Sequence, residues 1–327
     1  MTAMKTDREK IIEVLKEAEH FYLISHMQPD GDSIGSLLAM GEGLKSMGKQ
    51  VRMFTPGHIP RKYSFLKGAD QVEQALEECN PDVTAIVLDS SDADRMGILK
   101  EPFMNCRTVI NIDHHVTNQW FGTLNLVDSN ASATGEIIYH LLNEIGASID
   151  YYIAEALYVA ISTDTGSFKY ENTMPGTHRV VAELLEKDLS PGALSQRIFD
   201  ERPLSFYLLL REAISSLEMY SGKRIAVMTL SRDIRQRSGA TSDDLDGIVN
   251  YTRNIEGVEL GILFYVENGG EVKVGFRSKA LDVSVLAGRL NGGGHARAAG
   301  CRIYEDYQSV KEKVLAESMQ MLNELPG

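Results

Sequence analysis

The sequence predicts an α/β protein with three parts: an N-terminal domain whose mainly parallel sheet is flanked by helices, a helical connector, and a smaller C-terminal α/β domain. The first observation is that short β-branched apolar runs alternate with stretches of helical apolar spacing, which is typical of βαβ units. The second is the length, because 327 residues exceed what one hydrophobic core normally holds. We expect boundaries that divide the chain into 1–188, 189–220 and 221–327.

The N-terminal domain is expected to begin with a helix over 6–19, where apolar residues recur at helical spacing behind Thr6, a suitable N-cap. Apolar runs bounded by polar turns then predict strands. A second helix is predicted to start near Ser33 and to be closed by Gly48. The expected strands are 21–26, 50–55, 84–89 and 108–113, and the expected helices after the first are 33–47, 133–144 and 153–161.

The rest of the chain is expected to form the connector and a second α/β pattern. The segment from 175 to 220 shows helical spacing with interruptions at Pro191 and Pro203. The second α/β pattern begins at Lys223. Its expected strands are 224–230, 258–266 and 271–277, and its expected helices are 242–254 and 307–325.

The composition limits what the protein binds. A net charge of −13 argues against a protein that grips long nucleic acid, because such proteins carry a basic stripe that contacts phosphates. No run is apolar and long enough for a bilayer, and the N-terminus lacks the apolar core of a signal peptide, so we expect a cytoplasmic protein without membrane contact. An acidic chain can still bind a small polyanion when metal ions supply local positive charge.

The first of four polar clusters follows the strand predicted at 21–26 and contains His26, Asp30 and Asp32. One imidazole and two carboxylates so close together suit a hard or borderline divalent cation. The alternative is an ordinary capping turn, in which Asp32 or Ser33 caps the next helix. The cluster alone does not decide between the two.

The other clusters also stand at the ends of predicted elements. Asp89 ends one apolar strand and the triplet Asp113-His114-His115 ends another, at the edge where an open α/β sheet presents ligands. Taken singly, either Asp89 or the triplet could instead be the solvated polar end of a strand. Asp164 follows the apolar helix expected at 153–161, and a carboxylate at a helix C-terminus opposes the helix dipole unless a cation offsets it.

Together the clusters predict a site for two divalent metal ions that share a carboxylate. Several carboxylates and two or three imidazoles suit a pair of ions better than a single one. Two ions roughly 3.5–4 Å apart can hold both the attacking and the leaving oxygen in phosphoryl transfer. Mixed His and carboxylate ligation without thiolates favours Mn²⁺ over Zn²⁺.

In this order, the four clusters resemble the DHH phosphoesterase superfamily, which takes its name from the triplet Asp113-His114-His115. The C-terminal part resembles the associated DHHA1 domain through 274–278 (Val-Gly-Phe-Arg-Ser) and 292–300 (Gly-Gly-Gly-His-Ala-Arg-Ala-Ala-Gly). The resemblance thus covers almost the whole chain. Within the superfamily, the length and the stretch 164–168 (Asp-Thr-Gly-Ser-Phe) are most similar to the NrnA-type nanoRNases, which are bifunctional oligoribonucleases and pAp phosphatases.

The resemblance implies a role for each residue of the clusters. His26, Asp30 and Asp89 would hold the first Mn²⁺, and Asp32, Asp89, His114 and Asp164 would hold the second, with Asp89 bridging the two. Mg²⁺ or Co²⁺ would be the alternative ions. Asp113 would orient the imidazole of His114, because metal-bound histidines usually donate their other N–H to an acceptor. His115 would contact the scissile phosphate or assist the leaving group, so the implied catalytic set is His115, Asp113 and Asp89.

The C-terminal glycine run is expected to help bind a phosphate. Gly292-Gly293-Gly294 lets the backbone approach an anion closely, and a helix starting after it would add its positive dipole end. His295, Arg297 and Arg277 would supply side-chain donors. Considered without the metal site of the first domain, a Gly-rich turn with solvated cations is the favoured interpretation, and the resemblance reverses that preference.

Two residues near the clusters have competing interpretations. Trp120, five residues after the triplet, could stack on a nucleobase, but packing is the favoured interpretation. Ser132 is interpreted as the cap of the helix expected at 133–144 rather than as a nucleophile, since no base triad surrounds it.

The leading hypothesis is a Mn²⁺-dependent phosphoesterase that hydrolyses short RNA oligonucleotides to mononucleotides and 3′-phosphoadenosine 5′-phosphate (pAp) to AMP, with a hydroxide activated by two metals as nucleophile. Its partners would be these small nucleotides, and a homodimer is left open. The alternative is a phosphodiesterase that uses the same site on cyclic dinucleotides or on linear pApA and pGpG. From a different class, a non-catalytic nucleotide-binding regulator would lack a ligand in at least one cluster, and none is missing.

Overall fold

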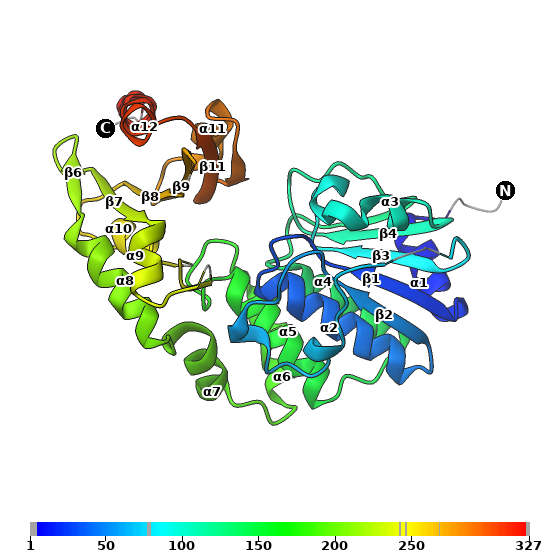
Figure 1. Cartoon of the computed structure of the whole chain (residues 1–327). Coiled ribbons are helices and arrows are strands. Elements are labelled where there is room, and N and C mark those ends of the chain that lie inside the picture. The colour runs from blue at the N-terminus through cyan, green and yellow to red at the C-terminus, as the bar shows by residue number, and fades with distance from the viewer. Residues whose placement is uncertain (1–4, 77–79, 242, 246, 268, 325–327) are drawn as a thin grey trace. The chain divides into compact units, whose positions relative to one another are not determined.

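The computed structural model describes residues 5–76, 80–241, 243–245, 247–267 and 269–324, except the side chains of Asp243 and His295. The chain folds into two compact units, Met1–Glu201 and Arg202–Gly327 (Figure 1). Each unit contains one sheet packed against helices, so the predicted α/β class is confirmed. The described helices include none with the length and apolarity needed to cross a bilayer. The boundaries expected at 188 and 220 stay predictions.

The first unit is built on a five-stranded, all-parallel sheet of order β2-β1-β3-β4-β5. β1 lies between β2 and β3, so the chain turns to opposite sides of β1 and creates a switch point at the carboxyl ends of β1 and β3. Every residue of β3 is buried, as expected for an inner strand covered on both faces. The strands are β1 (His20–Ile24), β2 (Gln50–Phe54), β3 (Thr84–Leu88), β4 (Thr108–Asp113) and β5 (Leu124–Val127).

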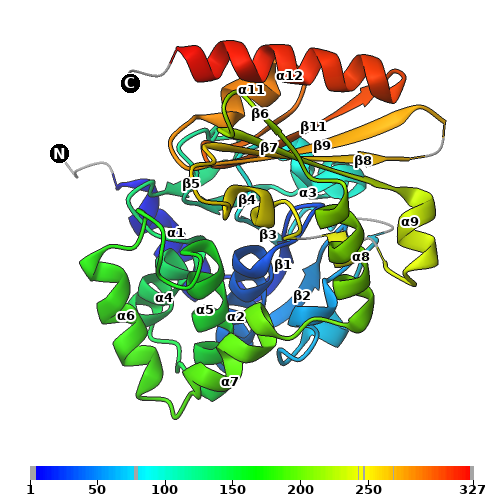
Figure 2. The ribbon, with the colours of Figure 1, turned by 90° about the vertical axis from the view of Figure 1, so that its left-hand side faces the viewer.

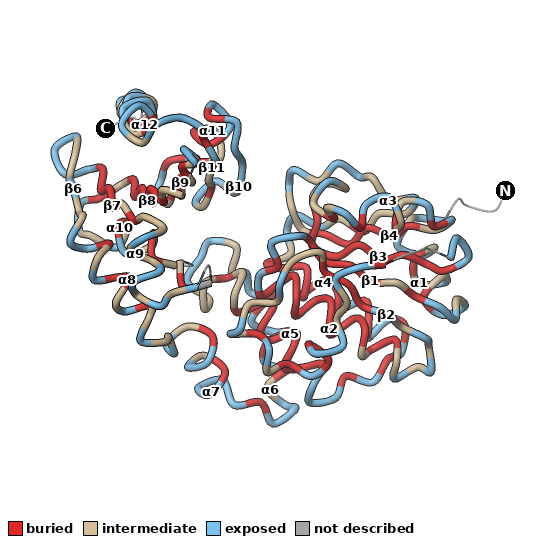
Figure 3. Tube along the Cα trace, viewed as in Figure 1, coloured by how far each residue is buried: buried red, intermediate tan, exposed pale blue. Residues whose placement is uncertain are grey.

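Helices cover both faces of this sheet. On one face α2 and α5 pack closely. The helices approach so closely at Gly35 that a Cβ there would come within 2.4 Å of the Ala156 carbonyl oxygen. On the other face α3 contributes Phe103 to a smaller core. Figure 3 shows the buried stretches that run through α2, α5 and the strands. The helices are α1 (Asp7–Glu17), α2 (Gly31–Ser46), α3 (Lys100–Met104), α4 (Thr134–Ile145), α5 (Tyr151–Asp164), α6 (Pro175–Leu185) and α7 (Pro191–Ser195).

The second unit has a six-stranded mixed sheet of order β10-β11-β9-β8-β7-β6, in which β7 and β8 run parallel and the other neighbours antiparallel. α11 and α12 pack on one face over Phe264 and Phe276, and Figure 2 shows α12 lying along that face. α8 packs on the other face against Met228 and Leu263. The elements are α8 (Leu204–Ser215), β6 (Glu218–Tyr220), β7 (Ile225–Ser231), α9 (Arg232–Arg237), α10 (Asn250–Arg253), β8 (Leu260–Val266), β9 (Glu271–Ser278), α11 (Val283–Arg289), β10 (Gly293–His295), β11 (Ala298–Tyr304) and α12 (Tyr307–Asn323).

The structure differs from the expected elements in several places, and the short elements α3, α9, α11 and β10 were not expected. β5 and β6 were not expected, because strands of three or four residues at a sheet edge are too short to show a pattern. The helix expected over 242–254 is reduced to α10, and two of its residues, 242 and 246, lie outside the described residues. β11 occupies the end of the expected glycine-rich turn, since Ala299 and Cys301 alternate into the core.

Candidate metal centre

The polar clusters converge at the carboxyl edge of the first sheet. β1, β3 and β4 are neighbours, and His26, Asp89 and Asp113 follow or end them. Asp32 reaches the same place from the first turn of α2, and Asp164 from the last turn of α5. Three groups have ligand atoms within 4.8 Å of one another: Asp89, His114 and His115; His26, Asp30 and Asp89; and Asp32, His114 and Asp164.

His26 is buried without a hydrogen-bond partner. It is 1% exposed, and among the described residues neither of its ring nitrogens makes a hydrogen bond. The nearest carboxylate oxygen is Oδ2 of Asp89, 3.5 Å from Nε2. A buried polar group without a partner is energetically costly, so the His26 imidazole is suited to binding a metal ion at this position.

Asp30 is exposed and caps α2, since its Oδ1 accepts a hydrogen bond from the Ser33 N–H at 3.0 Å. The alternative in which Asp32 or Ser33 caps this helix was therefore wrong in its choice of residue. Capping uses one carboxylate oxygen, so the second oxygen of Asp30 is compatible with ligation.

Asp32 is buried and joins α2 to the start of α4. Its Oδ2 accepts from the Thr134 N–H at 2.6 Å, and its Oδ1 accepts from the Gly135 N–H at 2.9 Å. Ala133, the N-cap of α4, has no side-chain acceptor, so Asp32 satisfies these helix donors from another element. The expectation that Ser132 caps α4 was wrong, because a carboxylate distant in sequence takes that place.

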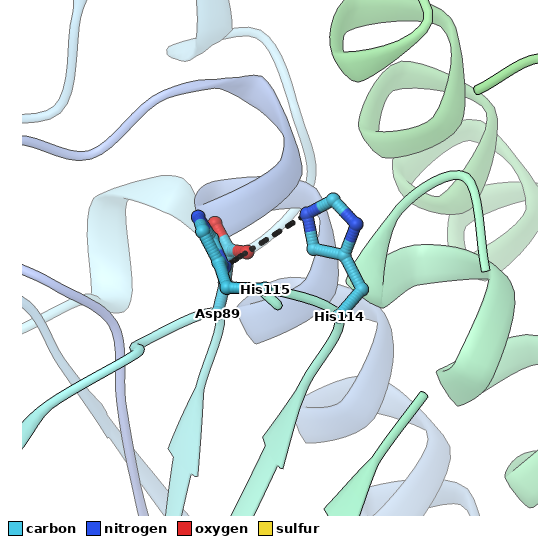
Figure 4. Close-up of side chains that lie close together, drawn as sticks. All are labelled: Asp89, His114 and His115. Atoms are coloured by element: carbon cyan, nitrogen blue, oxygen red, sulfur yellow. Dashed lines mark ion pairs between the residues drawn. The ribbon is translucent and has the colours of Figure 1, made fainter. Parts of the chain in front are cut away.

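Asp89 lies between His26 on one side and the pair His114 and His115 on the other. It follows β3 directly with φ +57°, a left-handed conformation that Asp tolerates better than most residues and that is often found at functional sites. Its Oδ1 accepts from the Thr134 hydroxyl at 3.0 Å and lies 3.8 Å from His114 Nε2 and 3.7 Å from His115 Nδ1 (Figure 4). Its Oδ2 faces His26. One carboxylate thus contacts imidazoles on two sides.

His114 is held at one ring nitrogen and faces carboxylates at the other. Its Nδ1 lies 3.3 Å from the Ala131 carbonyl oxygen. Its Nε2 lies 3.6 Å from Asp164 Oδ2 and 3.8 Å from both Asp32 Oδ2 and Asp89 Oδ1. When Nδ1 donates to the carbonyl, Nε2 carries the lone pair, which is the tautomer in which an imidazole binds a metal ion.

Asp113 pairs with His115 and not with His114. Its Oδ1 lies 2.6 Å from His115 Nδ1, and its Oδ2 accepts from Asn118 Nδ2 at 2.6 Å. The expected pairing with His114 was wrong, because residues two apart along an extended strand end point to the same side. Burial alone would lower the pKa of His115, but the hydrogen bond to Asp113 and the negative charges of Asp89 and Asp113 together outweigh it and raise the pKa to about 9.

The carboxylates are too crowded to be stable as neighbouring anions. Burial raises the pKa of Asp32 well above its usual value, and the charge of Asp89 raises it further. Burial also raises the pKa of Asp164, to about 7. Burial acts on Asp89 in the same direction, but the neighbouring imidazoles, His26 first among them, overcome it and hold the pKa below the usual range.

The site therefore fits divalent cations. Cations would neutralise the buried carboxylates and give partners to the ring nitrogens of His26 and His114. The donor set consists of imidazole nitrogens and carboxylate oxygens, which suits the Mn²⁺ class of ions.

The C-terminal residues expected to bind phosphate lie in one sheet of the second unit. Strand register places position 295 opposite Ala298, and Ala298 opposite Arg277, in one row across β10, β11 and β9. The Arg277 guanidinium donates to Asn250 Oδ1 at 3.1 Å, and that of Arg297 to the Ala280 carbonyl at 2.7 Å. The side chain of His295 lies outside the description.

The expectation that a helix follows the glycine run was wrong, because 293–295 form β10 and pair with β11. A Cβ on Gly292 would come within 2.2 Å of the Gly300 carbonyl oxygen, and Gly294 has φ +140°, so the fold itself requires both glycines. Gly293 would have nothing within 4 Å of a Cβ. Packing therefore accounts for two of the three glycines.

Several polar residues that support the site were not predicted from the sequence. Thr134 binds Asp89, Asn118 binds Asp113, and Asn172 donates to Asp164 Oδ2 at 3.3 Å and to the Ser132 carbonyl at 2.9 Å. Asn111 is fully buried inside β4 and accepts from Asn118 at 2.8 Å. A single amide within an otherwise apolar strand was the signal in the sequence that could have found this network.

Comparisons with known proteins agree with this architecture. The model of the DHH family, N-terminal domain, matches residues 20–161, and that of the DHHA1 domain matches residues 222–324. An exopolyphosphatase-related protein from Bacteroides fragilis has a similar fold, with a TM-score of 0.86 at 22% identity over 97% of this chain and 95% of that chain. RecJ from Thermus thermophilus, solved with Mn²⁺, gives a TM-score of 0.54 at 12% identity over 99% of this chain and 55% of its own.

Curated relatives match over nearly the full length. The chain is 34% identical over 309 residues to the bifunctional oligoribonuclease and PAP phosphatase NrnA of Thermus thermophilus, covering 93% of this chain and 91% of the relative. It is 29% identical over 304 residues to the protein of the same name from Bacillus subtilis, covering 92% and 94%. The order of the two domains and the extent of these matches show that the chain belongs to the DHH phosphoesterase family, in which a DHHA1 domain follows the DHH domain.

Proposed function

We propose that this phosphoesterase is metal-dependent and hydrolyses short RNA oligonucleotides to mononucleotides and pAp to AMP. The observation that carries the proposal is the convergence of ligand atoms from four separate segments of the first unit at one sheet edge. The two NrnA proteins described above, which match along nearly their whole length, support these substrates. Mn²⁺ is the proposed ion, because imidazole and carboxylate donors without thiolates favour it.

The proposed ligands divide between two ions. His26, Asp30 and Asp89 would hold one, and Asp32, Asp89, His114 and Asp164 the other. Contacts of Asp89 with His26 through Oδ2 and with His114 through Oδ1 support its bridging role. The ions, when bound, polarise the attacking water and offset the charge of the phosphoryl group.

The residues of the chain would orient and complete this site. Asp113 fixes the ring of His115 through the 2.6 Å contact, so His115 is the proposed contact for the scissile phosphate or the leaving oxygen. Thr134, at the start of α4, donates to both Asp32 and Asp89, and these hydrogen bonds would hold the two carboxylates in position for the ions. Arg277, Arg297, His295 and the glycine run, Gly292 to Gly294, are proposed to bind substrate phosphate.

One panel of substrates tests the function. The purified chain with Mn²⁺ is given pAp, an RNA dinucleotide, a long RNA oligomer, pyrophosphate and a cyclic dinucleotide. We expect phosphate from pAp, mononucleotides from the dinucleotide, and little turnover of the long oligomer. Turnover of pyrophosphate alone, or of the cyclic dinucleotide in preference to the others, would contradict the proposal.

Asp89→Asn is the matched control for this panel. It keeps the size of the side chain and the tolerance of a left-handed backbone but removes the charge. We expect its activity on every substrate to fall by at least about 10²-fold with the circular dichroism spectrum unchanged. Unaltered turnover by the folded variant would contradict the ligand role of Asp89.

A further inference from the structure

Trp120 has an unusual environment for the only tryptophan of the chain. The residue is 59% exposed, so the packing interpretation of the sequence was wrong. Its backbone has φ +54°, a left-handed conformation that is an outlier for a bulky residue. Such a conformation persists where the surrounding structure fixes it, and it is common at ligand clamps.

The loop that carries Trp120 is fixed to the candidate metal centre. The Trp120 N–H donates to Asn118 Oδ1 at 2.7 Å, and Asn118 Nδ2 donates to Asp113, the partner of His115. The neighbouring Gln119 N–H donates to the Ser91 carbonyl at 2.8 Å, in the segment just after Asp89. The backbone of Trp120, which carries the exposed indole, is therefore connected to His115 through the side chains of Asn118 and Asp113.

Phe121, the residue after Trp120, anchors the loop to the hydrophobic core. Phe121 packs against the smaller core that includes Phe103. The chain therefore turns the ring of Phe121 inward and leaves the preceding ring, that of Trp120, exposed. Among the described residues no other ring or cation contacts the indole. A largely exposed aromatic side chain, on a loop that is hydrogen-bonded to the candidate metal centre, suits stacking on a planar ligand.

From these contacts we infer that Trp120 is a stacking platform for a base of the bound nucleotide, next to the phosphate that is hydrolysed. This inference rests on the proposed function and names how that site selects nucleotides over other phosphoesters. Stacking binds the ground state and the transition state alike, so its loss raises KM more than it lowers kcat. Every base has a π-face, so the contact tolerates any base and rejects a substrate without one.

Kinetics with a matched pair of substrates tests the inference. pAp and ribose 3′,5′-bisphosphate differ only by the base. Trp120→Ala should raise KM for pAp by about 5- to 150-fold, and Trp120→Phe by less, while KM for the baseless compound changes less than about twofold. Tyr151→Ala is the control, since Tyr151 is an exposed aromatic residue at the opposite end of α5 from Asp164. An unchanged KM for pAp in folded Trp120→Ala overturns the inference.

Fluorescence separates this inference from the proposed function. All tryptophan emission comes from Trp120, so it can be titrated with AMP and with ribose 5-phosphate in the presence of Mn²⁺. Quenching by AMP but not by ribose 5-phosphate supports stacking. This holds even if the wild-type protein does not hydrolyse pAp, because missing hydrolysis would refute only the proposed function. Equal responses to both compounds, or no response to either, overturn the inference.

Discussion

At the scale of single residues, the two histidines of the triplet have different surroundings despite being adjacent. His114 directs Nε2 at three carboxylates, whereas His115 has its Nδ1 in a short contact with Asp113. The rings meet edge to face with centroids 4.8 Å apart. Their proposed roles as ligand and as substrate contact follow from this difference.

Substituting each histidine separately tests the division. His114→Ala should lose bound metal, with affinity reduced at least about tenfold, because three carboxylates lose their shared nitrogen. His115→Ala should keep its metal and lose about 10²- to 10⁴-fold in rate, as expected when a group that transfers protons is removed. Metal content after gel filtration and single-turnover rates measure the two effects. Equal loss of metal from both variants would contradict the division of roles.

The sequence was sufficient to predict which residues gather at the candidate metal centre but not how they pair. His26, Asp89 and the triplet could be identified because polar side chains at the ends of apolar strands meet at one sheet edge. The contact of Asp113 with His115, rather than with His114, depends on side-chain directions that no residue pattern records. The exposure of Trp120 was missed for the same reason, since a lone aromatic residue is more often packed.

At the scale of elements, the close packing of α2 on α5 sets where the first turn of α2 lies. Gly35 permits it, because a Cβ there would come within 2.4 Å of the Ala156 carbonyl oxygen and within 2.9 Å of the Ala160 Cβ. Backbone of a neighbouring helix cannot move away cheaply. The sequence predicted both helices, but it could not predict which faces meet.

Gly35→Ala should therefore destabilise the protein. Overpacking of this kind costs about 1–3 kcal/mol, so we expect the melting temperature to fall by several degrees. Gly192→Ala is the control, since nothing lies within 4 Å of a Cβ at that position of α7 and Ala favours helix. A melting temperature of Gly35→Ala equal to that of the wild type would show that the helices separate at no cost.

At the scale of the whole molecule, the candidate metal centre weakens the fold when no cation is present. Asp164 in the folded protein has its pKa raised to about 7, mainly by burial, against an ordinary value of 3.8. A raised pKa means that the folded state prefers the protonated acid. Its favourable contribution is full below the unfolded pKa and is lost as pH rises through about 7.

Asp164→Asn tests this dependence in metal-free protein. At pH 8 the variant should melt at a higher temperature than the wild type, because the buried charge is gone. At pH 5 the difference should be clearly smaller, since pH 5 lies closer to the unfolded pKa and the wild-type carboxyl is then mostly protonated in the folded state. Added Mn²⁺ should stabilise the wild type more than the variant at pH 8. The same difference in melting temperature at both pH values would contradict the proposed cause.

The hydrogen bonds from the start of α4 to Asp32 also bear on how the chain folds. The Asp32–Thr134 contact joins positions 102 residues apart, and Asp164 lies further along the chain still. Contacts of such high sequence separation form late, because the entropy of closing a long loop is lost before they are made. A nascent polypeptide that ends before Thr134 would lack both backbone donors that bind the Asp32 carboxylate. Uptake of the proposed ion would then require that the segments from His26 to Asp164 have come together.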